Sequence, residues 1–407
     1  MSHILADKTF GNQIHFEQVE NSYTKLKSYC EQEKFKGWDP FDGLNSRLFS
    51  SLIGFKENRV IKLAWIQFFK RSPINFRKVL LVPKDFNNKA LGLFLSGYCK
   101  EYSYNSSEAI LQKIIEISNQ LLNSVTPSYS GACWGYNFDW QARAFFQPKY
   151  TPTVVATSFI GNALLDAFDV LGDTKLLEAA RSSCDFILND LNKTYNDKGD
   201  FCFSYSPLDK SVVFNASLLG SKLLSRTYNY TKEEMLIYNA SRSVSYCCNL
   251  QNSNGSWSYG TLPFHKWVDN FHTGFNLECL SEYAQYSSDA RFDINLSKGL
   301  EYYLNNFFLE NGTPKYYNDR IYPIDIHASA QLVITLHKLD RFVQYKPLID
   351  KVLSWTIENM QDSKGYFYYQ INRHLSSKIP YMRWAQAWMF YALSTYLLTF
   401  QTSDSKI

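Results

Sequence analysis

Residues 131–172 join an aromatic loop, GACWGYNFDWQARAFFQPKYTP, to an apolar helix, TVVATSFIGNALLDAFDVLG. The loop places several large aromatic side chains beside an aspartate and an arginine, a composition that suits a concave binding surface. The helix begins after Pro152 and repeats apolar residues at helical spacing, so we expect a buried wall that positions the loop. The same loop-then-helix unit recurs along the chain.

Glycines in the loops mark the recurrence. Gly199, Gly255, Gly312 and Gly365 are 53 to 57 residues apart, and Gly131 begins a longer version of the unit. Each glycine follows one predicted helix and precedes the next, which is typical of repeated helical hairpins. The predicted helices cover residues 14–31, 59–70, 86–102, 106–124, 153–171, 174–190, 212–228, 232–250, 269–286, 291–309, 325–340, 344–360 and 382–399.

The repeat predicts an all-α fold, an (α/α)6 toroid of six helical hairpins. A hairpin cannot bury both of its apolar faces alone, and closing six of them into a ring removes the exposed ends. The loops that enter the inner helices would then line one mouth of the ring. We predict an N-terminal helix over 1–36, an insertion or lid over 37–84, the toroid over 85–400 and a disordered tail over 401–407.

Three helix starts are predicted from short-range signals. Asn105 with Glu108, and Thr231 with Glu234, form capping-box patterns that would start helices near 106 and 232. Asp173 is the expected cap of a third helix.

Composition narrows the class of protein. The 407 residues are 45% hydrophobic and 17% aromatic, which predicts a large core and favours a ligand with broad, partly apolar faces such as a sugar. A net charge of +4 without long charged blocks gives no support for a nucleic-acid partner. Eight cysteines without a C-x-x-C pair are typical of a reducing compartment.

No membrane span or leader is predicted. The N-terminus lacks the charged-then-apolar pattern of a secretory signal, and the longest apolar stretch, 387–400, is too short to cross a bilayer. We therefore expect a cytoplasmic protein.

Two loops resemble the Gln-Trp repeat of terpenoid cyclase and prenyltransferase toroids. They are Gln251-x-x-x-Gly255-x-Trp257 and Gln361-x-x-x-Gly365-x-Phe367. The resemblance implies the same ring fold. The chain contains no Asp-Asp pair, so it lacks the acidic clusters of the cyclases.

The last hairpin, GYFYYQINRHLSSKIPYMRWAQAWMFYALSTYLL, is similar to the C-terminal helical domain of uronyl (glucuronyl) 5-epimerases. Those enzymes carry a Y-D-x-R-H segment and then a P-x-x-x-R-W segment. The positions that resemble them here are Tyr369, Arg373, His374, Arg383 and Trp384, with each spacing different by one residue. The resemblance implies a glucuronate-containing polysaccharide as substrate. The chain departs from the family at Gln386, which stands where the catalytic tyrosine is expected.

Aligning the hairpins on their glycines puts Asn215, His272, His327 and Trp384 at one first-turn position. Two imidazoles facing one cavity could serve as acid and base, because histidine titrates near neutral pH. The alternative is that each histidine bonds its local aspartate, Asp269 or Asp325, as part of a helix cap. We predict no metal and no other cofactor.

Further candidate residues lie on the predicted mouth. Asp139 on the longest loop, with Asp269 or Asp325, could form the carboxylate pair of a glycosidase. Arginine forks suit an anionic sugar, and tryptophan faces suit sugar rings. The candidates for proton transfer are His272, His327, Asp139, Tyr259 and Tyr316, and those for substrate binding are Trp134, Tyr136, Trp140, Arg143, Asn215, Trp257, Asp269, Asp325, Arg373, Arg383 and Trp384.

The leading hypothesis is an enzyme of polysaccharide biosynthesis or modification that abstracts a proton next to a carboxylate of an anionic glycan, as an epimerase or a lyase. Three alternatives stay open. They are a glycoside hydrolase with paired aspartates, an isoprenoid-binding toroid, and a noncatalytic glycan-binding module.

Overall fold

The computed structural model describes residues 16–404 except 52–53, 55–56 and 144, so the predicted absence of a leader and residues 405–407 of the predicted tail lie outside it. Within the described residues, six helices form an inner ring around one axis. They are α4 (Asn88–Tyr104), α6 (Val154–Leu171), α8 (Phe214–Thr231), α10 (Asn270–Ser287), α12 (Ile326–Lys338) and α14 (Ala387–Asp404).

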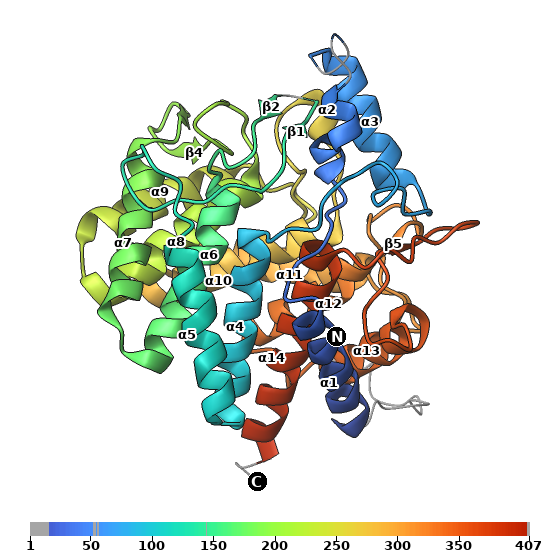
Figure 1. Cartoon of the computed structure of the whole chain (residues 1–407). Coiled ribbons are helices and arrows are strands. Elements are labelled where there is room, and N and C mark those ends of the chain that lie inside the picture. Colours follow the sequence, from blue (N-terminus) through green and yellow to red (C-terminus); the bar gives the residue numbers. More distant parts are fainter. Residues whose placement is uncertain (1–15, 52–53, 55–56, 144, 405–407) are drawn as a thin grey trace.

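The outer helices alternate with the inner ones along the chain. They are α1 (Phe16–Gln32), α5 (Glu108–Leu122), α7 (Thr174–Asn189), α9 (Glu234–Asn249), α11 (Asp293–Asn306) and α13 (Lys346–Met360). Each inner helix packs on the outer helix that follows it, except that α14 packs on α1 (Figure 1). The predicted N-terminal helix is therefore the outer member of the last hairpin.

The ring is closed, as the repeat predicts. Every inner helix packs against the next, and α14 packs along α4. Figure 1 shows these first and last inner helices side by side. The predicted all-α toroid is confirmed.

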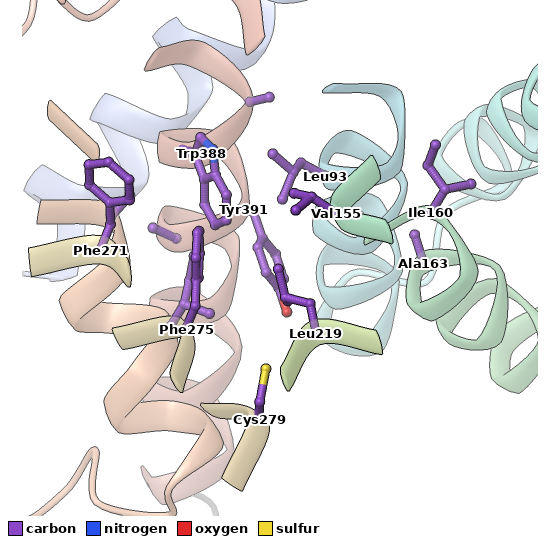
Figure 2. Close-up of a cluster of buried hydrophobic side chains, with 14 of the residues drawn as sticks. Leu93, Val155, Ile160, Ala163, Leu219, Phe271, Phe275, Cys279, Trp388 and Tyr391 are labelled. Carbon is purple, nitrogen blue, oxygen red and sulfur yellow. The ribbon is translucent and has the colours of Figure 1, made fainter. Parts of the chain in front are cut away.

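Apolar side chains fill the centre of the ring. Phe275 on α10 and Trp388 and Tyr391 on α14 point inward, towards Leu93 on α4 and Leu219 on α8 (Figure 2). Phe275, Trp388 and Leu93 are among the buried hydrophobic residues of one continuous core. Burial of such large side chains supplies most of the driving force for closing the ring.

A layer of buried ion pairs lies below this aromatic centre. The amine of Lys338 lies 2.7 Å from a Glu282 oxygen, and Lys222 pairs with both Glu278 and Glu282. Arg226 pairs with Asp166 at 2.8 Å, and these charged side chains border a small void with Trp388. Because the charges are paired, these side chains can fill this end of the axis without leaving a buried charge unpaired.

The loop glycines allow close contact between neighbouring hairpins. A Cβ on Gly255 would lie 2.3 Å from the carbonyl oxygen of Lys298 on α11, and one on Gly365 would lie 2.3 Å from that of Lys25 on α1. Both glycines have positive φ, at +89° and +97°. Glycine is favoured at such positions for both reasons.

The Gln-Trp resemblance has a structural explanation at the same contacts. The Gln361 amide donates to the carbonyl oxygens of Gly365 in its own loop and of Ser22 on α1, each at 3.0 Å. Gln251 does the same with Gly255 and Asn295. The repeated glutamines therefore tie each loop to the next outer helix.

Short strands and 3₁₀ or π turns shape the upper mouth. The antiparallel pairs are β1 (Trp140–Gln141) with β2 (Phe146–Gln147), β3 (Lys193–Tyr195) with β4 (Phe201–Phe203) and β5 (Ile324–Asp325) with β6 (Gln370–Ile371). The remaining elements are η1 (Asp42–Asn45), α2 (Arg47–Ser51), α3 (Arg59–Arg71), η2 (Pro263–His265), η3 (Ala290–Phe292) and η4 (Met382–Gln386).

The helix starts differ in part from the predictions. Asp173 caps α7 as expected, since its side chain accepts the Lys175 N–H. The other capping boxes are wrong: Ser107 caps α5, and α9 starts after Glu233 without a side-chain cap. At α5 a neighbouring polar residue, Ser107, is the N-cap in place of the predicted one, and at α9 no side chain caps the helix.

The apolar length of α6 and the C-terminal end of α14 also differ from the predictions. By length and composition alone, α6 could span a membrane, but it is a largely buried inner helix. Helix α14 runs to Asp404, past the predicted start of the tail. All eight cysteines are free and buried, as their apolar surroundings in the sequence suggest.

We expect Gly365→Ala to destabilise the protein more than Gly172→Ala, by about 1–3 kcal/mol. Both glycines have positive φ, which costs alanine about 1–2 kcal/mol, but nothing lies within 4 Å of a Cβ on Gly172. Urea denaturation of the two variants measures the difference. Equal losses would mean that the contact with Lys25 is not tight in solution.

Candidate functional site

A cavity of about 430 Å³ opens at the N-terminal end of the inner helices. Its wall combines the first turns of those helices, the loops that enter them and one side of α3. Among the described lining residues there is no aspartate or glutamate, whereas lysine, arginine and histidine side chains are present. The volume suits a small ligand or part of a larger one.

Most predicted site residues reach this cavity. The first-turn alignment places Asn215, His272, His327 and Trp384 in its wall, as expected. The aromatic and cationic candidates that also line it are Tyr136, Trp140, Arg143, Tyr259, Tyr316 and Arg383. The remaining candidates lie behind or away from the wall.

His272 is held by its helix cap. Asp269 accepts the His272 backbone N–H at 2.9 Å, and its carboxylate oxygens lie 2.8 and 3.0 Å from the Nδ1 atom of the ring. The Nδ1 proton therefore faces Asp269, which leaves Nε2 as the atom that can exchange a proton with a ligand. The helix-cap interpretation is confirmed for this residue, and the cap leaves Nε2 free for the proposed acid-base role.

His327 has different surroundings. Both ring nitrogens lack a hydrogen-bond partner among the described residues. The ring stacks on Phe271 at 4.4 Å and lies 4.1 Å from the Trp388 ring. Burial, followed by the charges of Lys89, His272 and Arg383, lowers the pKa of His327 well below its ordinary value. This imidazole is therefore neutral.

Asp325 caps α12 without bonding the imidazole of His327. It accepts from the His327 backbone N–H at 2.9 Å, the Gln370 amide at 2.6 Å and the Trp384 indole at 2.9 Å. Complete burial raises the pKa of Asp325 to about 6, although these donors and Lys70 oppose the shift. Its position behind the wall makes it a support for Trp384.

The two tyrosine candidates are protonated. Burial, with Asp269 nearby, raises the pKa of both Tyr259 and Tyr316. The Tyr259 ring stacks on Trp267 at 4.4 Å and lies 4.8 Å from the His272 ring. Both phenols suit proton donation better than proton abstraction.

Arg383 lies in the π-helical turn η4, but its fork is occupied. Its Nε and Nη2 atoms donate to the two carboxylate oxygens of Asp39 at 2.5 and 2.9 Å. The same segment is anchored by Arg77, whose Nε donates to Asp42 at 2.6 Å. The bidentate edge of Arg383 therefore holds residues 37–84 against the last inner helix and is not available to a ligand.

The structure places several candidates outside the cavity. The indole N–H groups of Trp134 and Trp257 donate to the carbonyl oxygens of Leu121 and Cys247, at the ends of the preceding outer helices. Both indoles are buried packing elements, so the expected sugar contact is wrong in this geometry. A buried indole needs such an acceptor for its N–H.

Asp139 and Arg373 are also absent from the cavity wall. Asp139 accepts the Lys149 backbone N–H at 2.8 Å and fixes its own loop. Arg373 is exposed beyond β6. The expected convergence of Asp139 with His272 on one cavity is therefore wrong.

Sequence reasoning missed three cations in the wall: Lys89 on α4 and Lys70 and Arg71 on α3. Burial lowers the pKa of Lys70, and the carboxylate of Asp325 opposes that shift. The available signal was Lys89 itself, a single cation in the first turn of the apolar stretch NKALGLFLSG. Among the described residues, no cluster of histidine, cysteine and carboxylate side chains could hold a metal ion.

No protein-family model and no curated protein matches the chain. Solved structures do match it over nearly their whole length. The chain has the α/α-toroid fold. Cellobiose 2-epimerase from Bacillus thermoamylovorans has a TM-score of 0.65 and 11% identity, over 95% of this chain and all of that one.

Two further neighbours show the range of activities on this fold. Unsaturated glucuronyl hydrolase from Streptococcus agalactiae has a TM-score of 0.59 and 13% identity, over 96% of this chain and 93% of that one. A GH76 α-mannanase from Bacteroides thetaiotaomicron has a TM-score of 0.62 and 11% identity, over 96% and 99%. All three are carbohydrate-active proteins, and at these identities the likeness establishes the fold.

We expect Asp325→Asn to gain stability relative to the wild type as the pH rises from 4 to 7. Because the pKa of Asp325 is raised to about 6 on folding, its contribution is full below about pH 4 and is lost as the pH rises through 6. The difference in free energy of unfolding should change by on the order of 3 kcal/mol. Urea denaturation at each pH measures it.

Asp197→Asn is the matched control, since that carboxylate is exposed in the folded chain. Its difference from the wild type should stay flat over the same pH range. A flat result for Asp325→Asn as well would contradict the assigned burial.

Proposed function

We propose that this protein is an enzyme that moves a proton at the carbon next to the carboxylate of an anionic sugar, within an oligo- or polysaccharide. One observation carries the proposal: the described cavity wall joins the imidazoles of His265, His272 and His327 to several cations and holds no carboxylate. Proton abstraction next to a carboxylate needs a base, a proton donor and a positive charge near the developing enolate. Each of these is available.

His272 is the candidate base. Asp269 fixes its ring and stabilises the imidazolium that forms when Nε2 takes the C5 proton of a uronate. The protonated phenols of Tyr259 and Tyr316 can donate a proton, and neutral His327 can form hydrogen bonds with the sugar hydroxyls. Return of the proton to the opposite face gives the epimer, and departure of the 4-linked substituent gives an unsaturated uronate.

Cations near the entrance favour an acidic ligand. Lys70, Arg71 and Arg143 line the outer wall, and Arg71 and Arg143 are exposed. They attract an anionic glycan before it binds, an effect that salt would screen. The carbohydrate-active structural neighbours support a saccharide as the ligand. The cellular setting that we propose is cytoplasmic polysaccharide biosynthesis or modification.

The alternatives have less support. Hydrolysis needs two carboxylates flanking the scissile bond, but Asp139, Asp269 and Asp325 are not among the lining residues. An isoprenoid would meet lysine and arginine side chains in the wall, which suit an apolar chain poorly. A noncatalytic glycan-binding module would use the pair of Asp269 and His272 only as the cap of α10.

The test is exchange of the C5 hydrogen in heavy water with glucuronate-containing oligosaccharides, followed by NMR. We expect exchange with the wild type and a loss of about 10²- to 10⁴-fold in His272→Gln, because the base is removed. Asp139→Asn is the matched control and should keep wild-type exchange, since Asp139 lies outside the cavity.

The outcomes separate the candidate functions. Release of reducing sugar without C5 exchange, and dependent on Asp139, would replace proton transfer with hydrolysis. Saturable glycan binding with neither exchange nor cleavage would favour the binding module. Exchange that survives in His272→Gln and is lost in His327→Gln would reassign the base.

A further inference from the structure

Lys89 lies at the floor of the cavity, where its amine is enclosed by aromatic rings. It is in the first turn of α4 and is only 4% exposed, yet it is one of the lining residues. Its Nζ atom lies 4.1 Å from the ring centroid of Phe159, 5.3 Å from that of Trp388 and 5.6 Å from that of Phe275. Figure 2 shows Phe275 and Trp388 facing each other at the ring centre.

This amine has no counter-ion. Within the described part of the chain, it forms no ion pair or hydrogen bond with a carboxylate. The charge of Asp39 raises the pKa of Lys89, but both oxygens of that carboxylate accept from Arg383. Lysine is rarely this buried without a partner, because desolvating an unpaired ammonium is costly.

The aromatic rings offset part of that cost, since they attract a cation through their faces. Burial, followed by the positive charge of Arg383, nevertheless lowers the pKa of the Lys89 amine well below its ordinary value. A ligand anion beside Nζ would act in the opposite direction and favour the charged form. The site thus lacks one negative charge that a ligand can supply.

The floor is also next to the imidazoles. The Phe275 ring that borders Lys89 has its centroid 5.6 Å from the His327 ring and 5.9 Å from the His272 ring. An anion held at Lys89 would therefore bring the adjacent carbon of a sugar close to both histidines. The cations on α3 are nearer the entrance, and Lys70 lies over Phe41.

We propose that Lys89 is the carboxylate subsite of the cavity, so that an acidic saccharide enters with its carboxylate first and the Lys89 ammonium is its counter-ion. This inference rests on the proposed function for the identity of the acid as a uronate. Anion binding at Lys89 does not itself require that a reaction follows.

The test is isothermal titration with D-glucuronate, D-glucose and D-glucose 6-phosphate. We expect the wild type to bind glucuronate more tightly than glucose by about tenfold or more, because a charged hydrogen bond forms at Lys89. Lys89→Met should lose this preference. Lys175→Met, which removes an exposed lysine on α7, is the matched control and should keep it.

Proton uptake is a second measurement on the same proteins. Titration over a series from about pH 7 to 10 in buffers of different ionisation enthalpy should show a pH range in which the wild type takes up protons when glucuronate binds, because the pKa of the free Lys89 amine lies below its ordinary value and an anion raises it. Lys89→Met should not, although the other titratable or charged groups around the site are unchanged in it; these are Arg383, Asp39, Lys70, His265, His272 and His327. Uptake that persists in Lys89→Met would assign the proton to a histidine and overturn the proposal.

Folding controls keep the test decisive. Methionine replaces an unpaired buried amine by an apolar group of similar length, so Lys89→Met should unfold at no lower a temperature than the wild type. Retained glucuronate preference in folded Lys89→Met, equal binding of glucuronate and glucose by the wild type, or a preference for glucose 6-phosphate would each overturn the carboxylate subsite. Loss of C5 exchange with intact, Lys89-dependent glucuronate binding would reject the proposed reaction alone.

Discussion

Contact between backbones is the constraint on which the ring depends. At each of the loops around Gly255, Gly312 and Gly365, the turn meets a carbonyl group of an outer helix in the neighbouring hairpin, at a separation that leaves no room for a side chain. Glutamine amides bridge the same junctions in two of these loops. The spacing between hairpins is therefore set by main-chain atoms. As a result, the N-terminal ends of the inner helices lie at about the same height along the axis of the ring.

Because these helix ends lie at the same height, the candidate functional side chains lie together at one end of the axis. First turns of the inner helices meet at the cavity, where their caps and orphan N–H groups need polar partners. Further down, aromatic side chains fill the ring, and below them come the ion pairs of Lys222, Glu282 and Lys338. The cavity thus ends on a closed floor. A ligand reaches the histidines from the side of the loops and α3.

The sequence predicted the fold well because its signals are local and repeated. Loop glycines, apolar periodicity and helix spacing are each visible within one hairpin. Because the same signals recur in several hairpins, each recurrence strengthens the prediction. The first-turn alignment also identified the two histidines. Prediction was poorer where one local feature suits two roles: Trp134 and Trp257 look like sugar platforms, but their indoles cap the preceding helices.

Contacts between residues that are far apart in the chain could not be predicted from the sequence. Asp39 and Arg383 are separated by 344 residues, and no local pattern indicates that a carboxylate near one end of the chain occupies an arginine near the other. The same pairing leaves Lys89 without a counter-ion, so the missing charge at the cavity floor follows from a contact that the sequence does not reveal. That the Lys89 amine is buried without a paired carboxylate can be recognised only from the three-dimensional arrangement of the surrounding elements.

The pairing of α1 with α14 bears on how the chain can fold during synthesis. Of the helices that form the ring, α1 is synthesised before the others, and α14, which packs on both α1 and α4, is synthesised after them. Contacts between such distant segments form slowly, because a long loop must close before they can stabilise anything. Until α14 is released, the nascent chain must keep the apolar sides of α1 and α4 without their final cover. Exposed apolar surface of this kind makes a folding intermediate prone to aggregation, which is the hazard that chaperones reduce.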